Sequence, residues 1–157
     1  MPKIDIDAMP LRTGSDYPTP LDERCKLRTS RQLAKGMDLT LVGINLATLP
    51  PGQWSSQRHW HGDEDEFVWV VSGEVVLVED EGETVLRAGD CAAWKAGVEN
   101  GHHLQNRTDR DAVLLQVGNP SDESRETVDY PDHDLIITPG GDGYRHRDGT
   151  LYPPNEG

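Results

Sequence analysis

Residues 59–79 read HWHGDEDEFVWVVSGEVVLVE, and no other stretch of the chain says as much about the fold. It contains two runs of β-branched and aromatic residues, FVWVV and VVLV, on either side of Ser72-Gly73. Such residues favour strands, because their side chains pack well on a pleated surface. Two strand-like runs around a short glycine-containing turn are typical of a β-hairpin, so we expect one over residues 66–80.

The strand pattern continues on both sides of this stretch. Before it, DLTLVGINLATL at 38–49 alternates in polarity and stops at Pro50-Pro51-Gly52. After it, residues 82–97 predict two short strands broken at 88–90, and HHLQNRT and DAVLLQVGN predict two more around a polar turn at 109–111. Residues 38–118 therefore carry about eight short strands, which predicts an all-β antiparallel sandwich or small barrel.

The two ends of the chain lack this pattern. Residues 1–36 contain four prolines and scattered charges, which predicts an N-terminal arm with little regular structure. Residues 119–157 are interrupted repeatedly by proline and glycine, which predicts a C-terminal extension that packs on the barrel without a core of its own. At 157 residues, one domain is expected. We divide the chain into the arm (1–36), the barrel (37–118) and the extension (119–157).

The composition argues against several classes of partner. With 28 acidic and 15 basic residues, the formal net charge is −13, so the average surface repels nucleic acids and anionic membranes. No apolar run reaches about 18 residues, and the first residues lack the apolar centre of a signal peptide. Cys25 and Cys91 show neither a CxxC spacing nor a disulfide-rich pattern. We expect a cytoplasmic protein with reduced thiols that binds neither nucleic acid nor membrane.

Two histidines lie at the start of the stretch 59–79. His59 and His61 are two residues apart, and in a strand such residues project from the same face, so both imidazoles can reach one ion. If a turn at 62–63 resets the alternation, Glu66 also points inward, together with Val68 and Val70. Phe67, Trp69 and Val71 then face outward, against another sheet or a partner subunit.

These residues resemble the first sequence motif of the cupin superfamily. That motif is a glycine, then His-x-His, four residues, a glutamate, six residues and a glycine; here it stands as Gly52, His59, His61, Glu66 and Gly73. The interval after Gly52 is one residue longer than usual.

The second cupin motif resembles the later part of the barrel segment, at Gly89, Gly97, His102 and Asn106. Lys95 stands where proline is usual, and the turn before the histidine is two residues longer than usual. This longer turn leaves both His102 and His103 open as a ligand, and the His-x-x-x-Asn spacing to Asn106 favours His102. Over residues 38–118 the chain is similar to small single-domain cupins of the cupin-2 type.

The resemblance implies a fold and a metal site. The fold would be the double-stranded β-helix, or jelly-roll barrel, here with an N-terminal arm and a C-terminal extension. One divalent metal ion would be held by His59, His61, Glu66 and His102, with two positions left for water or substrate. Such ligands suit Zn, Fe, Mn, Ni or Co alike. We expect Glu66 and Glu64 as catalytic carboxylates. One of Asp63, Glu64 and Asp65, which adjoin the ligands, could act as a general base; the alternative for all three is a solvated acidic turn.

Two classes of function follow. The resemblance favours a metal-dependent enzyme acting on a small polar substrate, either a sugar-phosphate isomerase or a dioxygenase. The alternative is a non-catalytic cupin module that binds or senses a small molecule. A sugar phosphate would need a basic group near the metal, and Lys95, Arg107 and Arg58 are the nearest in sequence. The outward stripe of Phe67, Trp69 and Val71, together with the resemblance, predicts a homodimer.

Overall fold

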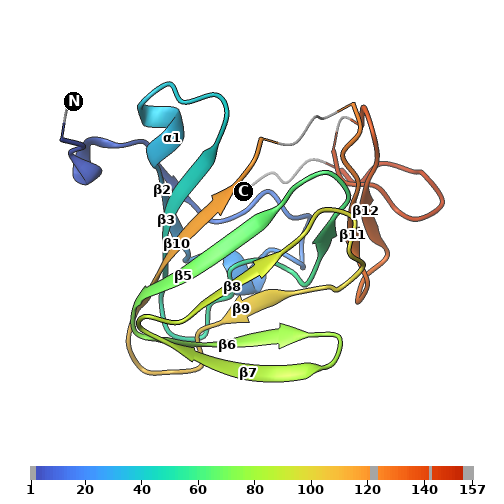
Figure 1. Cartoon of the computed structure of the whole chain (residues 1–157). Helices are drawn as coiled ribbons and strands as arrows, with labels where there is room; N and C mark the ends of the chain where they lie inside the picture. The colour runs from blue at the N-terminus through green and yellow to red at the C-terminus, as the bar shows by residue number, and fades with distance from the viewer. Residues whose placement is uncertain (1–2, 121–123, 142, 154–157) are drawn as a thin grey trace.

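The computed structural model describes residues 3–120, 124–141 and 143–153. The chain forms short strands joined by turns, with a single short α-helix among these residues (Figure 1). In chain order the elements are the 3-10 helix η1 (Ile6–Ala8), β1 (Leu11–Thr13), the 3-10 helix η2 (Glu23–Cys25), β2 (Thr29–Gln32), α1 (Leu33–Gly36), β3 (Gly43–Leu49), β4 (Trp60–His61), β5 (Glu66–Ser72), β6 (Glu74–Glu79), β7 (Gly82–Arg87), β8 (Cys91–Trp94), β9 (His103–Gln105), β10 (Ala112–Gly118), β11 (Val128–Tyr130) and β12 (Leu135–Ile137).

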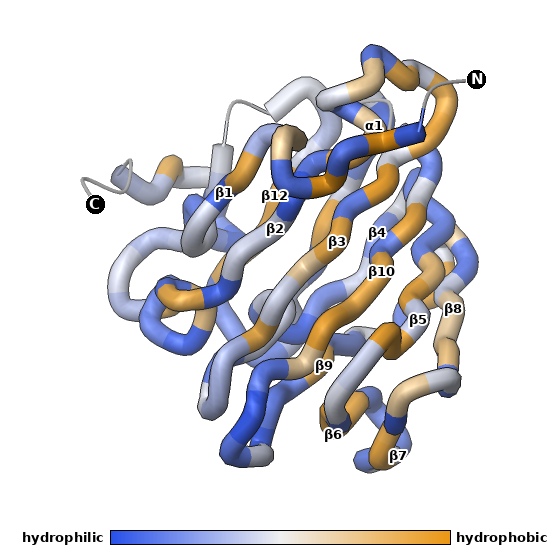
Figure 2. Tube along the Cα trace, turned by 90° about the vertical axis from the view of Figure 1, so that its left-hand side faces the viewer, coloured by the Kyte–Doolittle hydropathy of each residue, from blue (hydrophilic) through white to orange (hydrophobic). Residues whose placement is uncertain are grey.

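The largest sheet has the strand order β1-β2-β3-β10-β5-β8. Figure 2 shows these strands side by side across the face turned toward the viewer. The pairings are antiparallel: Ala112 to Gly118 of β10 pair with Leu49 to Gly43 of β3 on one side and with β5 on the other. This alternation of paired strands confirms the all-β antiparallel architecture expected from the sequence.

A second sheet, β7-β6-β9, closes the barrel, and the two sheets share one core. Residues of the first sheet meet residues of the second in a single buried cluster: Ala47, Leu49, Val68, Val70, Ala112 and Leu114 against Val75, Leu77, Leu86 and Leu104. The buried residues of β5 and β6 lie two apart, at Val68 and Val70 and at Val75 and Leu77, as period-2 alternation requires of strands with one covered face. The arrangement is the jelly-roll barrel.

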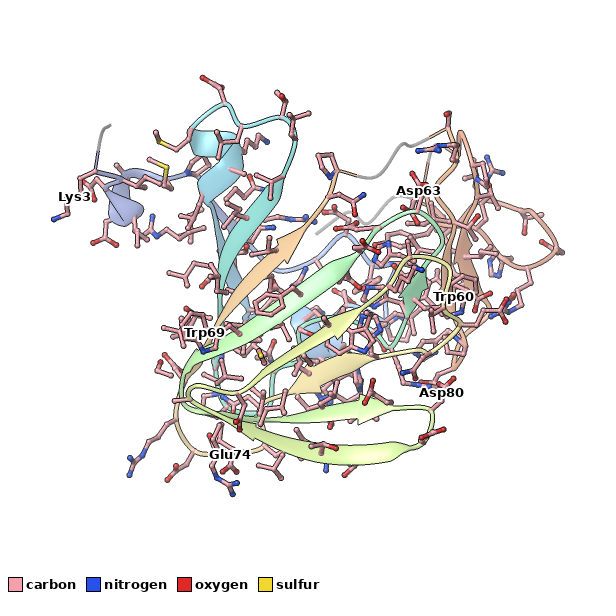
Figure 3. All side chains as sticks on the ribbon, viewed as in Figure 1. Lys3, Trp60, Asp63, Trp69, Glu74 and Asp80 are labelled. Atoms are coloured by element: carbon pink, nitrogen blue, oxygen red, sulfur yellow. The ribbon has the colours of Figure 1, made fainter. Side chains whose placement is uncertain are left out.

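The hairpin expected over residues 66–80 is wrong. β5 pairs with β8 and β10, whereas β6 pairs with β7 and β9, so the chain changes sheets between them. Gly73 makes this change with a φ of +82°, and a Cβ there would lie 2.7 Å from the Asp111 carbonyl oxygen. The true hairpin is β6–β7, with Asp80 at its tip (Figure 3).

The N-terminal arm has more regular structure than its composition predicts. β2 pairs with β3 and β1 pairs with β2, so the arm extends the large sheet beyond the barrel strands. Its prolines fall outside these two strands, which is why they do not prevent pairing.

The C-terminal extension lies beside β4. β11 pairs with β4 on one side and with β12 on the other, which makes a third, smaller sheet. A second buried cluster joins the extension to the arm: Tyr17 and Cys25 pack with Val128, Tyr130 and Leu135. The arm and the extension therefore pack against each other at one side of the barrel.

Over the parts of the chain that the structure describes, no helix has the length and apolar character needed to span a membrane.

Candidate metal centre

Backbone pairing joins the two segments of the chain that carry the expected histidine ligands. His59 and His102 form an isolated antiparallel bridge, with the His59 N–H donating to the His102 carbonyl at 3.2 Å and the His102 N–H donating back at 2.9 Å. Their rings lie 5.3 Å apart, and the His61 ring lies 4.9 Å from that of His59. A bridge between distant segments thus brings the three imidazoles to one place.

Glu66, the first residue of β5, lies among these rings. One ligand atom from each of His59, His61 and Glu66 falls within 4.8 Å of the other two. Oε2 of Glu66 lies 2.8 Å from Nε2 of His102 and 3.8 Å from Nε2 of His61. The structure therefore brings together all four residues expected as metal ligands.

The orientation of the rings fits a divalent cation. Nδ1 of His59 lies 2.8 Å from the Gln57 carbonyl oxygen, and Nδ1 of His102 lies 3.1 Å from that of Asn100. A carbonyl only accepts, so Nδ1 of each ring carries a proton, and Nε2 is the nitrogen that each ring turns toward the pocket. Lone pairs of neutral imidazoles and carboxylate oxygens aimed at a common point are a donor set for a cation.

Burial sets the charge of these ligands. It lowers the pKa of His59 to about 3, so this ring is neutral at physiological pH. Burial alone would raise the pKa of Glu66, but the hydrogen bond with His102 and the nearby histidines outweigh it and lower the pKa to about 2. The carboxylate is ionised and the imidazole is neutral, which are the forms that bind metal.

The structure separates His102 from His103. The His102 ring stacks on Trp94 at 3.8 Å between centroids and faces Glu66. His103 is turned away from Glu66: its Nδ1 lies 2.9 Å from the Ser56 carbonyl oxygen and its ring packs edge-on against Trp54. Asn106, fully buried, donates through its side-chain nitrogen to the carbonyls of Leu49 and Arg110, so it orders the turn after β9.

Glu64 lies beside the four residues. Its Oε2 is 3.7 Å from Nδ1 of His61, and it lines the same pocket as the expected ligands. Burial, followed by the charges of Glu66 and Glu126, raises the pKa of Glu64 to about 8. A Cβ at Gly118, the last residue of β10, would overlap Oε1 of Glu64. Glycine at this position therefore leaves room for the Glu64 carboxyl.

Glu126 is a carboxylate that the sequence interpretation missed. It is buried in the segment that leads into β11, and its Oε1 lies 3.4 Å from Nδ1 of His61 and 3.2 Å from the Gly62 N–H, which donates to it. Pairing of Val128 with His61 brings it there. No local spacing links residue 126 to residue 61, so only the strand pairing reveals the contact.

The four residues lie in a pocket of about 390 Å³. The basic residues expected near it are engaged elsewhere: Arg58 pairs with Asp80 and Asp132, and Arg107 pairs with Glu83. Lys95 lines a neighbouring hollow that shares Glu66 and Trp94 with this pocket, but Lys95 does not line the pocket itself. Instead, Arg12 and Arg28 of the N-terminal arm line the pocket, and the composition of the arm gave no sign of this.

The comparisons agree with this architecture. The model of the family described as "Cupin domain" matches residues 45–118. A sugar phosphate isomerase of the cupin superfamily from Silicibacter pomeroyi is 41% identical, with 97% of each chain covered and a TM-score of 0.89. No curated protein matches the chain.

Two further solved structures are similar in fold. A protein from Acidithiobacillus ferrooxidans, proposed to be a sugar phosphate isomerase, is 23% identical over 90% of each chain, with a TM-score of 0.73. A protein from Thermotoga maritima, predicted to be an oxalate decarboxylase, is 22% identical with a TM-score of 0.54, and the match covers 71% of this chain and 98% of that one. At these identities they support the fold alone.

Proposed function

This chain belongs to the cupin superfamily, and from that premise we propose that it is a metal-dependent isomerase of a sugar phosphate. One observation carries the proposal: a pocket holds three imidazoles and a carboxylate, with a second carboxyl, that of Glu64, beside them. The relative from Silicibacter pomeroyi, similar over 97% of the chain, supports the choice of reaction.

In this proposal His59, His61, Glu66 and His102 hold one divalent ion. Bound there, the ion supplies Lewis-acid polarisation of the substrate carbonyl. The donor set of three nitrogens and one oxygen is compatible with Zn, Fe, Mn, Ni or Co, so metal analysis decides its identity.

Glu64 moves the proton in this proposal. Interconversion of an aldose and a ketose transfers one proton from C2 to C1 and one from the C2 hydroxyl to the C1 oxygen, with no net oxidation. In its ionised form, Glu64 at the pocket wall can accept the C2 proton and return it to C1, and its raised pKa makes it a stronger base than an ordinary carboxylate. Trp94, stacked on His102, and buried Val68 and Leu104 form the apolar part of the wall and limit the access of water to this step.

The test is proton exchange. Metal-loaded protein, its metal identified by mass spectrometry, is mixed in D2O with a panel of aldose and ketose phosphates, and deuterium at C1 or C2 is followed by NMR. We expect metal-dependent incorporation with at least one substrate. Glu64→Gln should lose it by about 100-fold or more while retaining the metal. Glu81→Gln, the same change at an exposed turn, is the control and should behave like the unaltered protein.

The same samples test the two alternatives. Oxygen uptake with a redox-active ion, without deuterium incorporation, would favour a dioxygenase. Substrate binding without exchange or oxygen uptake would favour a binding or sensing module, and either result would overturn the isomerase.

The proposal includes the surroundings of the enzyme. We propose a homodimer, supported by the exposed side chains of Phe67, Trp69 and Val71 on β5. We also propose a cytoplasmic location, where a reducing environment keeps Cys25 and Cys91 as free thiols. The acidic charge supports a small molecule, and neither nucleic acid nor membrane, as the ligand.

A further inference from the structure

The N-terminal arm contributes two guanidinium groups to the pocket, and we propose that Arg12 and Arg28 form the subsite for the phosphate group of the substrate. The inference rests on the proposed function and adds to it the part of the substrate that is recognised and the residues that recognise it. Neither arginine lies within residues 45–118, the part matched by the cupin family model, so this subsite would be a feature of this chain beyond the shared barrel.

Arg28 is held in place without its charge being neutralised. Its Nε donates to the Gly14 carbonyl at 3.2 Å, and its Nη1 donates to the Ser55 carbonyl. Within the described residues, Arg28 forms no ion pair, and Nη2 takes part in no hydrogen bond. A guanidinium that neutral carbonyls orient, and whose Nη2 keeps its N–H groups available, is suited to bind a phosphate oxygen.

Arg12 is a more exposed partner. It lies in β1, and its guanidinium pairs with Asp16, whose side chain is 80% exposed. An ion pair this exposed contributes little to stability, because water screens both charges. Arg12 can therefore exchange the Asp16 carboxylate for a phosphate at little cost. Arg12 is in β1 and Arg28 directly precedes β2, and pairing of Thr13 with Thr29 brings the two segments together.

The charge of the pocket differs from that of the molecule. The whole chain carries −13, yet the pocket contains two arginines, and its two carboxyls, Glu64 and Glu66, lie at the histidine cluster. No ion pair among the described residues joins either arginine to Glu64 or Glu66. The pocket thus combines a site for a cation with a separate site for an anion, as a sugar phosphate requires of its receptor.

The size of the pocket fits a small phosphorylated sugar. Its volume of about 390 Å³ lies within the range of small-molecule sites, roughly 300–1,000 Å³. Asn45 of β3 and Gln116 of β10 also line it and offer amide groups for hydroxyl groups of the sugar.

Binding of three unreactive compounds tests the subsite. Glycerol 3-phosphate, glycerate and glycerol differ at one end only and have no carbonyl to isomerise. Isothermal titration calorimetry with metal-loaded protein should show that glycerol 3-phosphate binds more tightly than the other two. Arg12→Gln should weaken its binding by about 10- to 100-fold, the range for losing a hydrogen bond between charged groups. Arg28→Lys should weaken it similarly, because lysine keeps the charge but loses the planar fork.

Matched controls separate the subsite from the fold and from the metal. Arg110→Gln makes the same change at an exposed turn remote from the pocket and should leave binding unchanged. The metal content of both variants should equal that of the unaltered protein. If Arg28→Lys fails to fold, the surface variant Arg12→Gln carries the test.

Four results would overturn the subsite: no binding of glycerol 3-phosphate, equal binding in the arginine variants, loss of metal in the arginine variants, or tighter binding of glycerate, which would indicate a carboxylate site. Failure of the isomerase is distinguishable from these. If glycerol 3-phosphate binds through the arginines and no sugar phosphate is isomerised, the subsite stands and the proposed function does not.

Discussion

The imidazole of His61 is oriented differently from those of His59 and His102. His59 and His102 direct Nδ1 toward backbone carbonyls, whereas His61 directs it toward the carboxylate of Glu126 at 3.4 Å. Nδ1 of His61 has no hydrogen-bond partner among the described residues, but a carboxylate this close favours a proton on Nδ1, which would leave Nε2 free to bind metal and make it a stronger ligand. We therefore propose Glu126, from the C-terminal extension, as a positioning residue.

Replacing Glu126 tests this role. Glu126→Gln should lower the affinity for the metal by about 10- to 100-fold, measured by competition with a chelator, because an amide orients the ring less strongly. NMR of 15N-labelled histidine should show His61 shifting away from the tautomer with the proton on Nδ1, a change that a purely structural role would not cause. Glu99→Gln, at an exposed loop, is the control. Unchanged affinity and tautomer would refute the assignment.

At the residue scale, sequence spacing was informative only for ligands on adjacent strand positions or within recognised motifs. His59 and His61 share a strand face, and the motif intervals pointed to Glu66 and His102; the structure brings these four side chains together. Their binding of a metal stays a prediction. Arg12, Arg28 and Glu126 could not be predicted, because they reach the pocket through pairing between segments far apart in the chain.

At the scale of elements, the strands were predictable and their partners were not. Alternation of polarity located β3, β5, β6 and β10, because each has one buried face. The same alternation is compatible with a hairpin and with a change of sheet, so it could not show that β5 and β6 belong to different sheets. The arm was misjudged for a related reason: β1 and β2 are short, and they form by pairing, β2 with β3 and β1 with β2.

Gly73 provides a test of the change of sheet. A side chain there would need an unfavourable positive φ and would also meet the Ala112 Cα at 2.8 Å. Gly52 has a similar φ of +78° but open space around it, so it isolates the backbone effect. We expect Gly52→Ala to lower the free energy of unfolding by about 1–2 kcal/mol, and Gly73→Ala to cost about 1–3 kcal/mol more. Urea denaturation measures both, and equal costs would contradict the close approach.

At the scale of the whole molecule, the outer face of the large sheet stands out. Trp69 is 47% exposed, and it borders a hollow of about 270 Å³ lined with Ile6, Leu33, Leu46, Val71 and Leu115. An apolar face of this kind is unfavourable in water, and a second copy of the chain could cover it. This is the same stripe from which the sequence predicts a homodimer.

Light scattering tests the dimer. The unaltered protein should have about twice the monomer mass of 17.4 kDa, and Trp69→Glu should shift it toward the monomer, because a buried unpaired carboxylate disfavours the interface. Val85→Glu, which changes an exposed valine on β7, should leave the mass unchanged. A monomer mass for the unaltered protein would rule out the dimer.

The pairing of β2 with β3 has an evolutionary consequence. In the proposed function, the ion is bound by residues of the barrel and the phosphate by residues of the N-terminal arm. The arm is attached to the barrel through the pairing of β2 with β3. Mutations in the N-terminal arm could then change which molecules are accepted without altering the chemistry at the ion. After gene duplication, one copy could therefore acquire a new substrate through mutations in the arm, while the residues proposed to hold the ion and move the proton stay the same.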